Sequence, residues 1–400
     1  MGYMSEVVAS MLSMIFIVFA IGSIGYLIGG ISIKGISLGT AGVLLVALIY
    51  GVVASYIPEF KIGDSVVNLF NEKNKGLFSL VSSMGTAMFV TAVGLIAGPK
   101  FFRTFNKKSM SYICLGFIVI LIGTLTSIVL IKVFGVDTEM MVGLMCGALT
   151  TTPGFSAAKE TADALQKSTE MITAGYGIAY LFGILGVVLF VQIMPKLLKV
   201  NIEEENRKFT EIKVDIKENG KKRIQLEDLG LFPFFLAVAL GVIIGSFYIP
   251  GINFSLGTSG GTLIAGLIIG HFGHIGPIDC KIPKSTLNMF RELGLVLFLI
   301  GAGVPGGVNF ISNVKLSYFI YGIILTMVPM VVGFIIAKYV FKLSIFNNLG
   351  SITGGMTSTP ALGTLISVTG TDDVASAYAA TYPIALVSIV IAAKLMITLM

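Results

Sequence analysis

A short Thr-Pro stretch occurs twice in this chain, and it constrains the fold more than any other feature. Gly147–Gly154 reads GALTTTPG, and Gly354–Ala361 reads GGMTSTPA at an offset of 207 positions. Both copies have strongly apolar surroundings, yet both are rich in hydroxyls and glycine and contain a proline, which disfavours a helix interior. Irregular backbone at membrane depth has to line a cavity or be shielded by protein. Two such stretches in corresponding places of two halves indicate the binding site of a transporter.

The composition places both copies in a membrane. Of the 400 residues, 55% are hydrophobic and 12% are charged, and the mean hydropathy is +0.94. Soluble domains carry about a quarter charged residues. The sequence therefore predicts an all-α polytopic membrane protein, multi-pass in the cell membrane, with the lipid bilayer as a partner. The net charge of +6 fits the excess of Lys and Arg on cytoplasmic loops and does not indicate nucleic acid.

Apolar runs long enough to cross a hydrocarbon core of about 30 Å predict five spans in each half. The predicted spans are 7–29, 37–56, 77–97, 111–134 and 172–195, then 229–249, 257–272, 286–305, 316–342 and 374–398. Each Thr-Pro stretch falls between the fourth and fifth span of its half, at 141–160 and 346–366. The polar segment 196–228 holds nine Lys/Arg and eight Asp/Glu and is predicted to be a cytoplasmic linker. It separates a first membrane repeat, 1–195, from a second, 229–400.

The duplication extends beyond the Thr-Pro stretch. The run Leu38-Gly-Thr-Ala-Gly42 has a counterpart at Leu256-Gly-Thr-Ser-Gly260, and Tyr176-x3-Tyr180 has one at Tyr378-x3-Tyr382. A third set recurs at an offset of 209: Gly85, Phe89, Gly94, Gly98 and Phe101 match Gly294, Phe298, Gly303, Gly307 and Phe310. Repeats in a fixed order predict two copies of one structural unit. The many glycines on these spans are expected to let helices pack closely.

The basic residues predict how the two copies are oriented. If each Thr-Pro stretch is a re-entrant hairpin, the loops 30–36, 98–110 and 196–228 share one side and carry the excess of Lys and Arg. If the stretch crosses fully, 98–110 and 196–228 fall on opposite sides. The positive-inside rule favours the hairpin. Five spans per half then invert the second repeat, the two hairpins meet near the midplane, and both termini lie outside.

The hairpin tips are predicted to bind the substrate. Tips expose backbone N–H and C=O groups; helix N-termini hold anionic groups, whereas carbonyls suit Na⁺. The alternative is that Thr-x-Thr-Pro kinks a packed helix. The predicted substrate-binding residues are Thr150, Thr151, Thr152, Pro153 and Gly154 in the first stretch and Thr357, Ser358, Thr359, Pro360 and Ala361 in the second.

Arg291 is a further candidate because it lies in the eighth span, where the first repeat has Ser82. It is predicted to hold a substrate carboxylate. The alternative is that Arg291 and Glu292 form an interfacial pair that reaches water. Lys159 and Glu160, at the end of the first hairpin, are expected to be solvated caps.

Several runs resemble the bacterial aspartate–alanine exchanger family. They are GALTTTPGFSAA (147–158), GGMTSTPALGTL (354–365), AGVLLVALIYG (41–51), FVTAVGLIAG (89–98) and GYGIAYLFGILG (175–186). The resemblance implies an antiporter of carboxylates or amino acids. More distantly, FGVDTEMMVGLMCGALT (134–150) is similar to sodium–glutamate symporters, which implies two inverted five-span repeats, re-entrant hairpins, elevator movement and a homodimer. Many family members carry paired regulatory domains between their halves, whereas this chain has only 196–228 there.

The sequence thus predicts a secondary transporter that exchanges small organic anions such as aspartate and alanine. Na⁺- or H⁺-coupled symport, with Na⁺ as coupling ion, is the alternative, and a channel is the next. No cofactor or resident metal is expected. An enzyme is disfavoured because the sequence contains no HExxH motif and no nucleophile with an evident base nearby.

Overall fold

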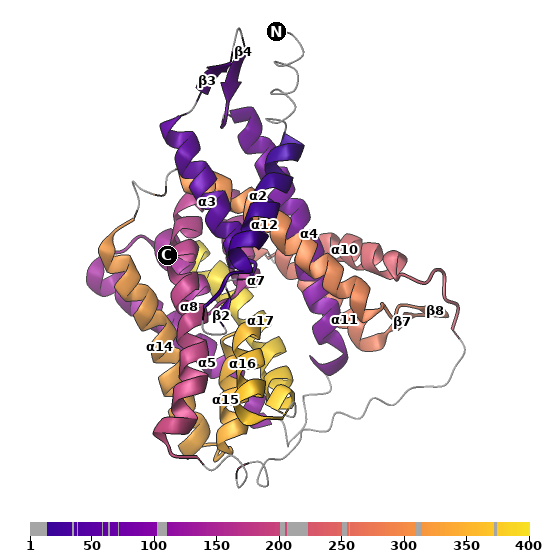
Figure 1. Cartoon of the computed structure of the whole chain (residues 1–400). Helices are drawn as coiled ribbons and strands as arrows, with labels where there is room; N and C mark the ends of the chain where they lie inside the picture. The colour runs from indigo at the N-terminus through magenta and orange to yellow at the C-terminus, as the bar shows by residue number, and fades with distance from the viewer. Residues whose placement is uncertain are drawn as a thin grey trace.

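In its described residues, the chain folds into a bundle of α-helices with four two-stranded β-hairpins between them (Figure 1). The structure, a computed structural model, describes residues 14–33, 36–37, 39–57, 59–62, 65–70, 72–101, 110–200, 205, 223–249, 254–255, 257–308, 310, 314–371 and 374–400. Most of the predicted linker 196–228 therefore lies outside the described residues. The protein is all-α in its membrane part, as predicted, because a helix satisfies its backbone hydrogen bonds without water.

The helices follow the order expected from the sequence. The first half contains α2 (Met14–Gly29), α3 (Ala41–Tyr56), α4 (Glu72–Phe101), α5 (Met110–Phe134), α6 (Thr138–Ala148), α7 (Thr152–Ala164) and α8 (Thr169–Leu197). The second contains α10 (Leu231–Ser246), α11 (Gly257–Phe272), α12 (Lys284–Val308), α14 (Leu316–Tyr339), α15 (Ile345–Gly355), α16 (Thr359–Thr369) and α17 (Val374–Leu399). The antiparallel hairpins pair β1 (Ser32–Ile33) with β2 (Ile36–Ser37), β3 (Glu59–Ile62) with β4 (Ser65–Asn68), β5 (Tyr248–Ile249) with β6 (Phe254–Ser255) and β7 (His274–Ile275) with β8 (Ile278–Asp279).

Six described helices are long and apolar enough to cross a membrane: part of α4, and all of α5, α8, α12, α14 and α17. The other four predicted spans correspond to α2, α3, α10 and α11, each of 16 residues. At 1.5 Å per residue such a helix is about 24 Å long, somewhat short of a full hydrocarbon core. Five spans in each half therefore stay a prediction for these four segments, and residues 7–13 of the first span lie outside the described residues.

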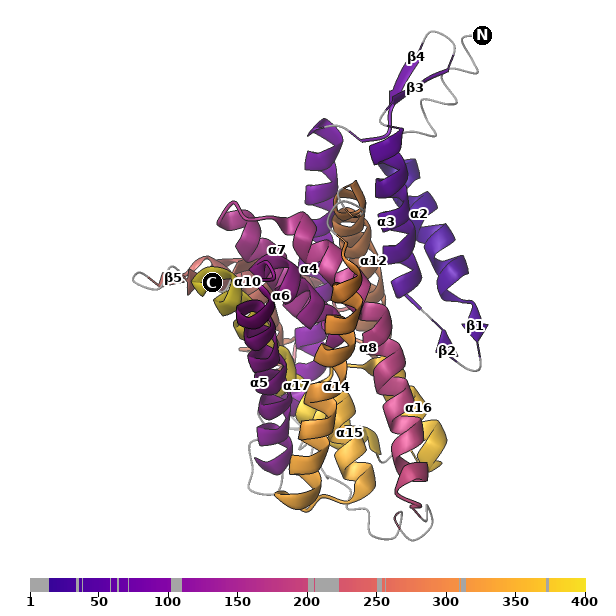
Figure 2. The same cartoon turned by 90° about the vertical axis from the view of Figure 1, so that its left-hand side faces the viewer.

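Both Thr-Pro stretches interrupt a helix. Between α6 and α7, Thr150 has a φ of +52°, and between α15 and α16, Thr357 has a φ of +51°. A β-branched residue in this left-handed region cannot continue a helix, so the chain turns there. Pro153 and Pro360 then occupy the first turns of α7 and α16, where no intrahelical N–H donor is needed. Figure 2 shows α6 and α7 above α15 and α16.

The helices form two groups, and each group combines elements of both halves. In one, α4 packs against α11 and α12, and α3 packs against α2 and α12. In the other, α8 packs against α6 and α14, and α17 packs against α5, α7 and α15. We call the first group (α2–α4 and α10–α12) the glycine bundle and the second (α5–α8 and α14–α17) the hairpin bundle. Figure 1 shows α10 and α11 on the right and α14 and α8 on the left.

Glycines allow the helices of the glycine bundle to lie close together. A Cβ atom on Gly51 would lie 2.1 Å from the carbonyl oxygen of Val304 and 2.8 Å from the Cα of Gly307, so α3 and α12 touch through backbone. Gly85 of α4 likewise faces Gly294 of α12. These residues belong to the glycine sets that recur in the sequence, and the expected close packing is confirmed.

Candidate functional site

The two Thr-Pro turns meet at the centre of the hairpin bundle. The hydroxyl of Thr150 donates to the carbonyl oxygen of Met356 over 2.7 Å, and the hydroxyl of Thr357 donates to the carbonyl oxygen of Leu149 over 3.1 Å. Each turn therefore supplies a donor to the other and accepts one in return. The two carbonyls follow the ends of α6 and α15, where a helix leaves acceptors without an intrahelical partner. The reciprocal bonds satisfy these buried acceptors.

A stack of aromatic rings supports the first turn. The ring of Phe155 lies 4.1 Å from that of Tyr176, which in turn lies 4.9 Å from that of Tyr180. The hydroxyls of Tyr176 and Thr152 are 3.1 Å apart and hydrogen-bonded. Side chains fixed by stacking and hydrogen bonding hold a site in one geometry. In the second half, Tyr378 and Tyr382 stack at 5.1 Å.

The turns differ at the residue that caps the following helix. The hydroxyl of Thr151 accepts a hydrogen bond from the backbone N–H of Gly154 over 3.3 Å. Ser358 occupies the equivalent position before α16, but its hydroxyl makes no such bond. The Ser358 oxygen is buried and has no hydrogen-bond partner among the described residues. A buried polar atom without a partner is costly, so Ser358 is a candidate for contact with a bound species.

A cavity of about 480 Å³ adjoins the two turns; we call it the tip cavity. Its lining includes five of the predicted substrate-binding residues, Thr150, Thr152, Pro153, Thr357 and Arg291. Thr151, Gly154, Ser358 and Ala361 are buried but do not line it. The side chains of Thr359 and Pro360 lie outside the described part of the structure. The other lining residues are Tyr26, Gly39, Thr40, Phe89, Val93, Tyr180, Ile184, Glu292, Leu295, Tyr382 and Leu386.

Arg291 lies in this cavity together with an acidic neighbour. Its guanidinium is 2.8 Å from the carboxylate of Glu292, and the two side chains are 33% and 42% exposed. Both are therefore within reach of a molecule in the tip cavity. Sequence reasoning identified the pair but assigned a binding role to Arg291 alone. It also used Tyr180 and Tyr382 as markers of the repeat, although their duplication in two apolar helices could have indicated the cavity wall.

A second cavity, of about 190 Å³, lies beyond the tip cavity along the same helices; we call it the Glu160 cavity. Residues 75–86 of α4 line it, whereas residues 89 and 93 line the tip cavity. On α12, which runs antiparallel to α4, residues 298–305 line it and residues 291–295 line the tip cavity. Five charged residues contribute to its wall: Lys75, Lys159, Glu160, Asp163 and Glu170.

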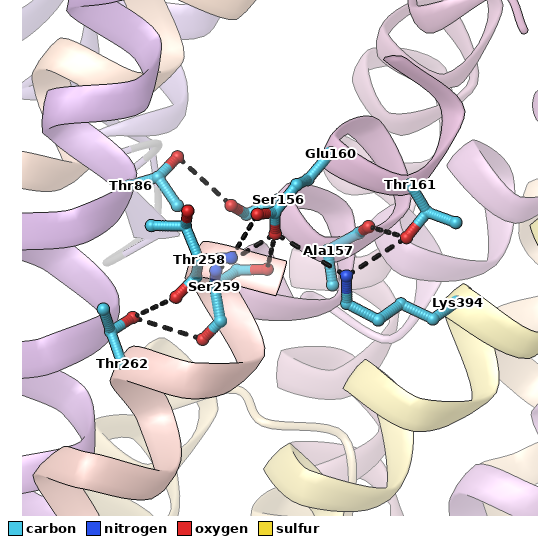
Figure 3. Close-up of polar contacts among 9 residues, drawn as sticks. All are labelled: Thr86, Ser156, Ala157, Glu160, Thr161, Thr258, Ser259, Thr262 and Lys394. Carbon is cyan, nitrogen blue, oxygen red and sulfur yellow. Dashed lines mark hydrogen bonds and ion pairs between the residues drawn. The ribbon is translucent and has the colours of Figure 1, made fainter. Parts of the chain in front are cut away.

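Glu160 is not the solvated cap that the sequence suggested. It lies within α7, four residues before the helix ends, and its carboxylate accepts hydrogen bonds at the N-terminus of α11 (Figure 3). The donors are the backbone N–H of Thr258, the backbone N–H of Ser259 at 3.0 Å and the hydroxyl of Ser259 at 2.6 Å. On its other side lies Lys394 of α17, 3.6 Å away and only 2% exposed.

Sequence reasoning missed Lys394. It is the one charged residue of α17, and an ionisable group in an otherwise uncharged span is by default a functional candidate. Its ammonium also donates to the hydroxyl of Thr161 over 3.1 Å. Among the described residues, no group of three or more His, Cys, Asp or Glu side chains could hold a metal ion.

Known proteins of similar sequence are transporters. A transporter of Bacteroides fragilis and one of Desulfotalea psychrophila, both named as uncharacterized, are each 25% identical to this chain. The alignment with the Bacteroides protein covers 94% of this chain and 96% of that protein. The alignment with the Desulfotalea protein covers 96% of each. A transporter of Corynebacterium glutamicum, also named as uncharacterized, is 25% identical over 94% of this chain and 97% of its own. The first alignment extends over 537 positions, so well over a hundred of them have no counterpart here.

The family comparison agrees with these names. The sequence profile described as Predicted Permease Membrane Region matches residues 15–196 and 233–398, which together make up most of the chain. Together with the six long apolar helices, the match supports a multi-pass membrane protein whose role is transport. The chain belongs to this permease family, the aspartate–alanine exchangers.

Proposed function

We propose that the protein is a secondary active transporter that exchanges small carboxylates or amino acids across the membrane. The observation that carries this proposal is the meeting of the two Thr-Pro turns beside a cavity that contains Arg291. The first turn of α7 lines this cavity, and so does Thr357, two residues before α16 begins. Helix N-termini carry partial positive charge of about half a unit each. With Arg291 and Glu292 cancelling one another, the site has a net charge of about +1, which suits a substrate of one net negative charge such as aspartate.

We further propose that the two halves are inverted repeats, each with a re-entrant hairpin. At 11 to 13 residues, each helix of the pairs α6–α7 and α15–α16 is too short to span a bilayer. The pair α6–α7 lies above the pair α15–α16 in Figure 2, and reciprocal hydrogen bonds connect their turns. One family profile matches each half in turn, which agrees with a division into 1–195, the cytoplasmic linker 196–228 and 229–400. Both termini then lie outside.

The proposed movement is an elevator. The hairpin bundle contains the tips, and the glycine bundle contains Arg291 and most of the cavity walls on α4 and α12. The tip cavity and the Glu160 cavity succeed one another along α4 and α12, so a sliding hairpin bundle would expose the tips to one and then the other. We expect the glycine bundle to form the contact of a homodimer. Na⁺ is the coupling ion of the symport alternative, and exchange needs no cofactor.

Counterflow in proteoliposomes tests this function. The purified protein is reconstituted with internal aspartate, alanine, another carboxylate or buffer alone, and uptake of labelled aspartate and alanine is measured. Exchange predicts uptake only when substrate is present inside. Uptake into buffer-filled vesicles under an imposed Na⁺ or H⁺ gradient would favour symport, and unsaturable flux without either would favour a channel. Absence of uptake for every carboxylate and amino acid under all conditions would refute the proposal.

A further inference from the structure

Three side-chain contacts connect the hairpin bundle to the glycine bundle around the Glu160 cavity. The carboxylate of Glu160 bonds to the N-terminus of α11 as described above. The hydroxyl of Ser156, one turn earlier on α7, donates to the hydroxyl of Thr86 on α4 over 3.1 Å (Figure 3). Lys75 of α4 lies 3.7 Å from the carboxylate of Glu170 on α8. Every one of these contacts has to break if the hairpin bundle moves away from this cavity.

The Glu160 contact is expected to be the strongest of the three because three donors converge on one carboxylate. A carboxylate at a helix N-terminus gains from charge-assisted hydrogen bonds and from the helix dipole. Two backbone N–H groups and the Ser259 hydroxyl converge on Glu160. Gly257, the first residue of α11, has a φ of +63°, and a Cβ atom there would lie 2.5 Å from the Glu160 carboxyl carbon. Glycine at this position therefore gives the carboxylate room to approach the helix end.

Lys394 makes the contact reversible. Both Lys394 and Glu160 belong to the hairpin bundle, so their pairing persists when the bundle moves. A carboxylate that left the α11 N-terminus without a counter-charge would keep a charge among packed helices with no partner to compensate it. With Lys394 beside it, Glu160 leaves as half of a neutral pair, and only the hydrogen bonds to α11 are lost.

The equivalent contact is missing at the tip cavity. By the repeat, Gly39 and Thr40 correspond to Gly257 and Thr258, and both line the tip cavity. Position 160 corresponds to Ser367, however, so α16 offers no carboxylate to the N-terminus of α3. Thr40, the residue before α3, makes no side-chain capping bond either. Within the described part of the chain, a charged contact therefore holds the hairpin bundle to the N-terminus of α11, and no equivalent contact holds it to the N-terminus of α3.

We propose that Glu160 is a positioning residue that holds the hairpin bundle against α11 and so sets the resting end state of the transporter. This inference rests on the proposed movement between two end states. Substrate passage then requires Glu160 to leave the α11 N-terminus together with Lys394. In the resting state these polar contacts hold the hairpin bundle at the Glu160 cavity, and the tips are reached through the tip cavity.

The test uses a variant that weakens the contact without burying an unpaired charge. Ser259→Ala removes the 2.6 Å hydroxyl bond and leaves the Glu160–Lys394 pair intact. The matched control is Thr262→Val on the same helix, because the Thr262 hydroxyl bonds only to carbonyls of α11, at 2.8 Å and 3.2 Å. Glu160→Gln is the stronger perturbation. It leaves Lys394 without its partner, so Ser259→Ala decides the outcome if that variant does not fold.

The readout is the reactivity of two cysteine reporters in nanodiscs, where both faces are accessible and no substrate is needed. Native cysteines at 114, 146 and 280 are replaced by alanine. Ser82→Cys reports on the Glu160 cavity, where Ser82 is 8% exposed, and Thr40→Cys reports on the tip cavity. We expect Ser259→Ala to raise the labelling rate of the first reporter about tenfold, equivalent to about 1.4 kcal/mol, and to lower that of the second.

The two labelling rates are expected to change in opposite directions, and this distinguishes a shift between end states from a general loosening of the structure. A purely structural cap would leave both rates unchanged or raise both, and either result in Ser259→Ala would overturn the inference. Thr262→Val is expected to leave both rates as in the parent. If the reporters respond as expected while counterflow finds no substrate, the proposed substrate class fails and the assignment of Glu160 stands.

Discussion

The reciprocal bonds between the two turns can be tested by removing each hydroxyl in turn. Thr150→Val and Thr357→Val keep the shape of the side chain and delete the donors to the carbonyls of Met356 and Leu149. A buried acceptor left without a partner costs about 1–3 kcal/mol. For domains of about 150–250 residues, 1 kcal/mol lowers the melting temperature by about 2–4 °C, so each variant should melt several degrees lower.

The double variant adds a sharper criterion. Both hydrogen bonds hold the two Thr-Pro turns together. Losing one therefore lets the turns separate and weakens the other. We therefore expect the loss in Thr150→Val/Thr357→Val to be smaller than the sum of the single losses, by about 0.5–3 kcal/mol. Thr150→Gly should destabilise less than Thr150→Val. It loses the same bond but removes the strain of a β-branched residue at a φ of +52°, which costs about 1–3 kcal/mol.

Thermal unfolding in nanodiscs and substrate competition in the counterflow assay are measured on the same preparations. Thr126→Val is the matched control, because its hydroxyl donates over 2.7 Å to a carbonyl within α5 and joins nothing else described. Melting temperatures that stay at the parent value in both single variants, together with weaker substrate competition, would refute the reasoning. The two hydroxyls would then bind substrate, as the sequence predicts, and would not stabilise the contact between the turns.

Three further predictions concern the site and the topology. Ser358→Ala should leave the melting temperature nearly unchanged, because its buried oxygen has no described partner, and should weaken substrate competition; unchanged competition would show that Ser358 contacts no bound species. Arg291→Gln should weaken aspartate far more than alanine, and Arg291→Lys should keep part of the affinity; equal losses would assign Arg291 to folding. Asp137→Cys and Ala164→Cys, which flank the first hairpin, should react with an impermeant thiol reagent from outside, and Lys196→Cys only from the cytoplasm; labelling of the first two from opposite faces would exclude a re-entrant hairpin.

The duplicated features of the sequence were the most informative about the structure. Thr150 and Thr357 stand at equivalent places of the two copies, and the structure brings them together with the same φ and with exchanged hydrogen bonds. The recurring glycines mark the helix contacts of the glycine bundle. A repeat constrains pairs of positions at once, which is why it is more informative about helix contacts than any single residue.

Contacts between residues far apart in sequence could not be predicted. The hydroxyls of Thr150 and Thr357, which are predicted to bind substrate, each also donate across more than 200 positions to the other turn, a contact that no local pattern in the sequence indicates. Glu160 was taken for a solvated cap because the first hairpin was predicted to end there. The helix α7 continues to Ala164, so Glu160 still faces α11. Its partner Lys394 lies in the last helix, and no local pattern connects the two.

The two cavities differ in their charged residues, although corresponding residues of the two sequence copies line one cavity each. Phe298 lines the Glu160 cavity and its counterpart Phe89 lines the tip cavity, yet the charged pairs have no counterparts. Arg291 and Glu292 stand where the first copy has two serines, and Glu160 and Lys394 stand where the other copy has Ser367 and Gln192. Two copies with the same contacts at both ends would give two end states of similar free energy. In the proposed elevator, the free-energy difference between the two end states, and the choice of substrate, then depend on the residues at which the copies differ.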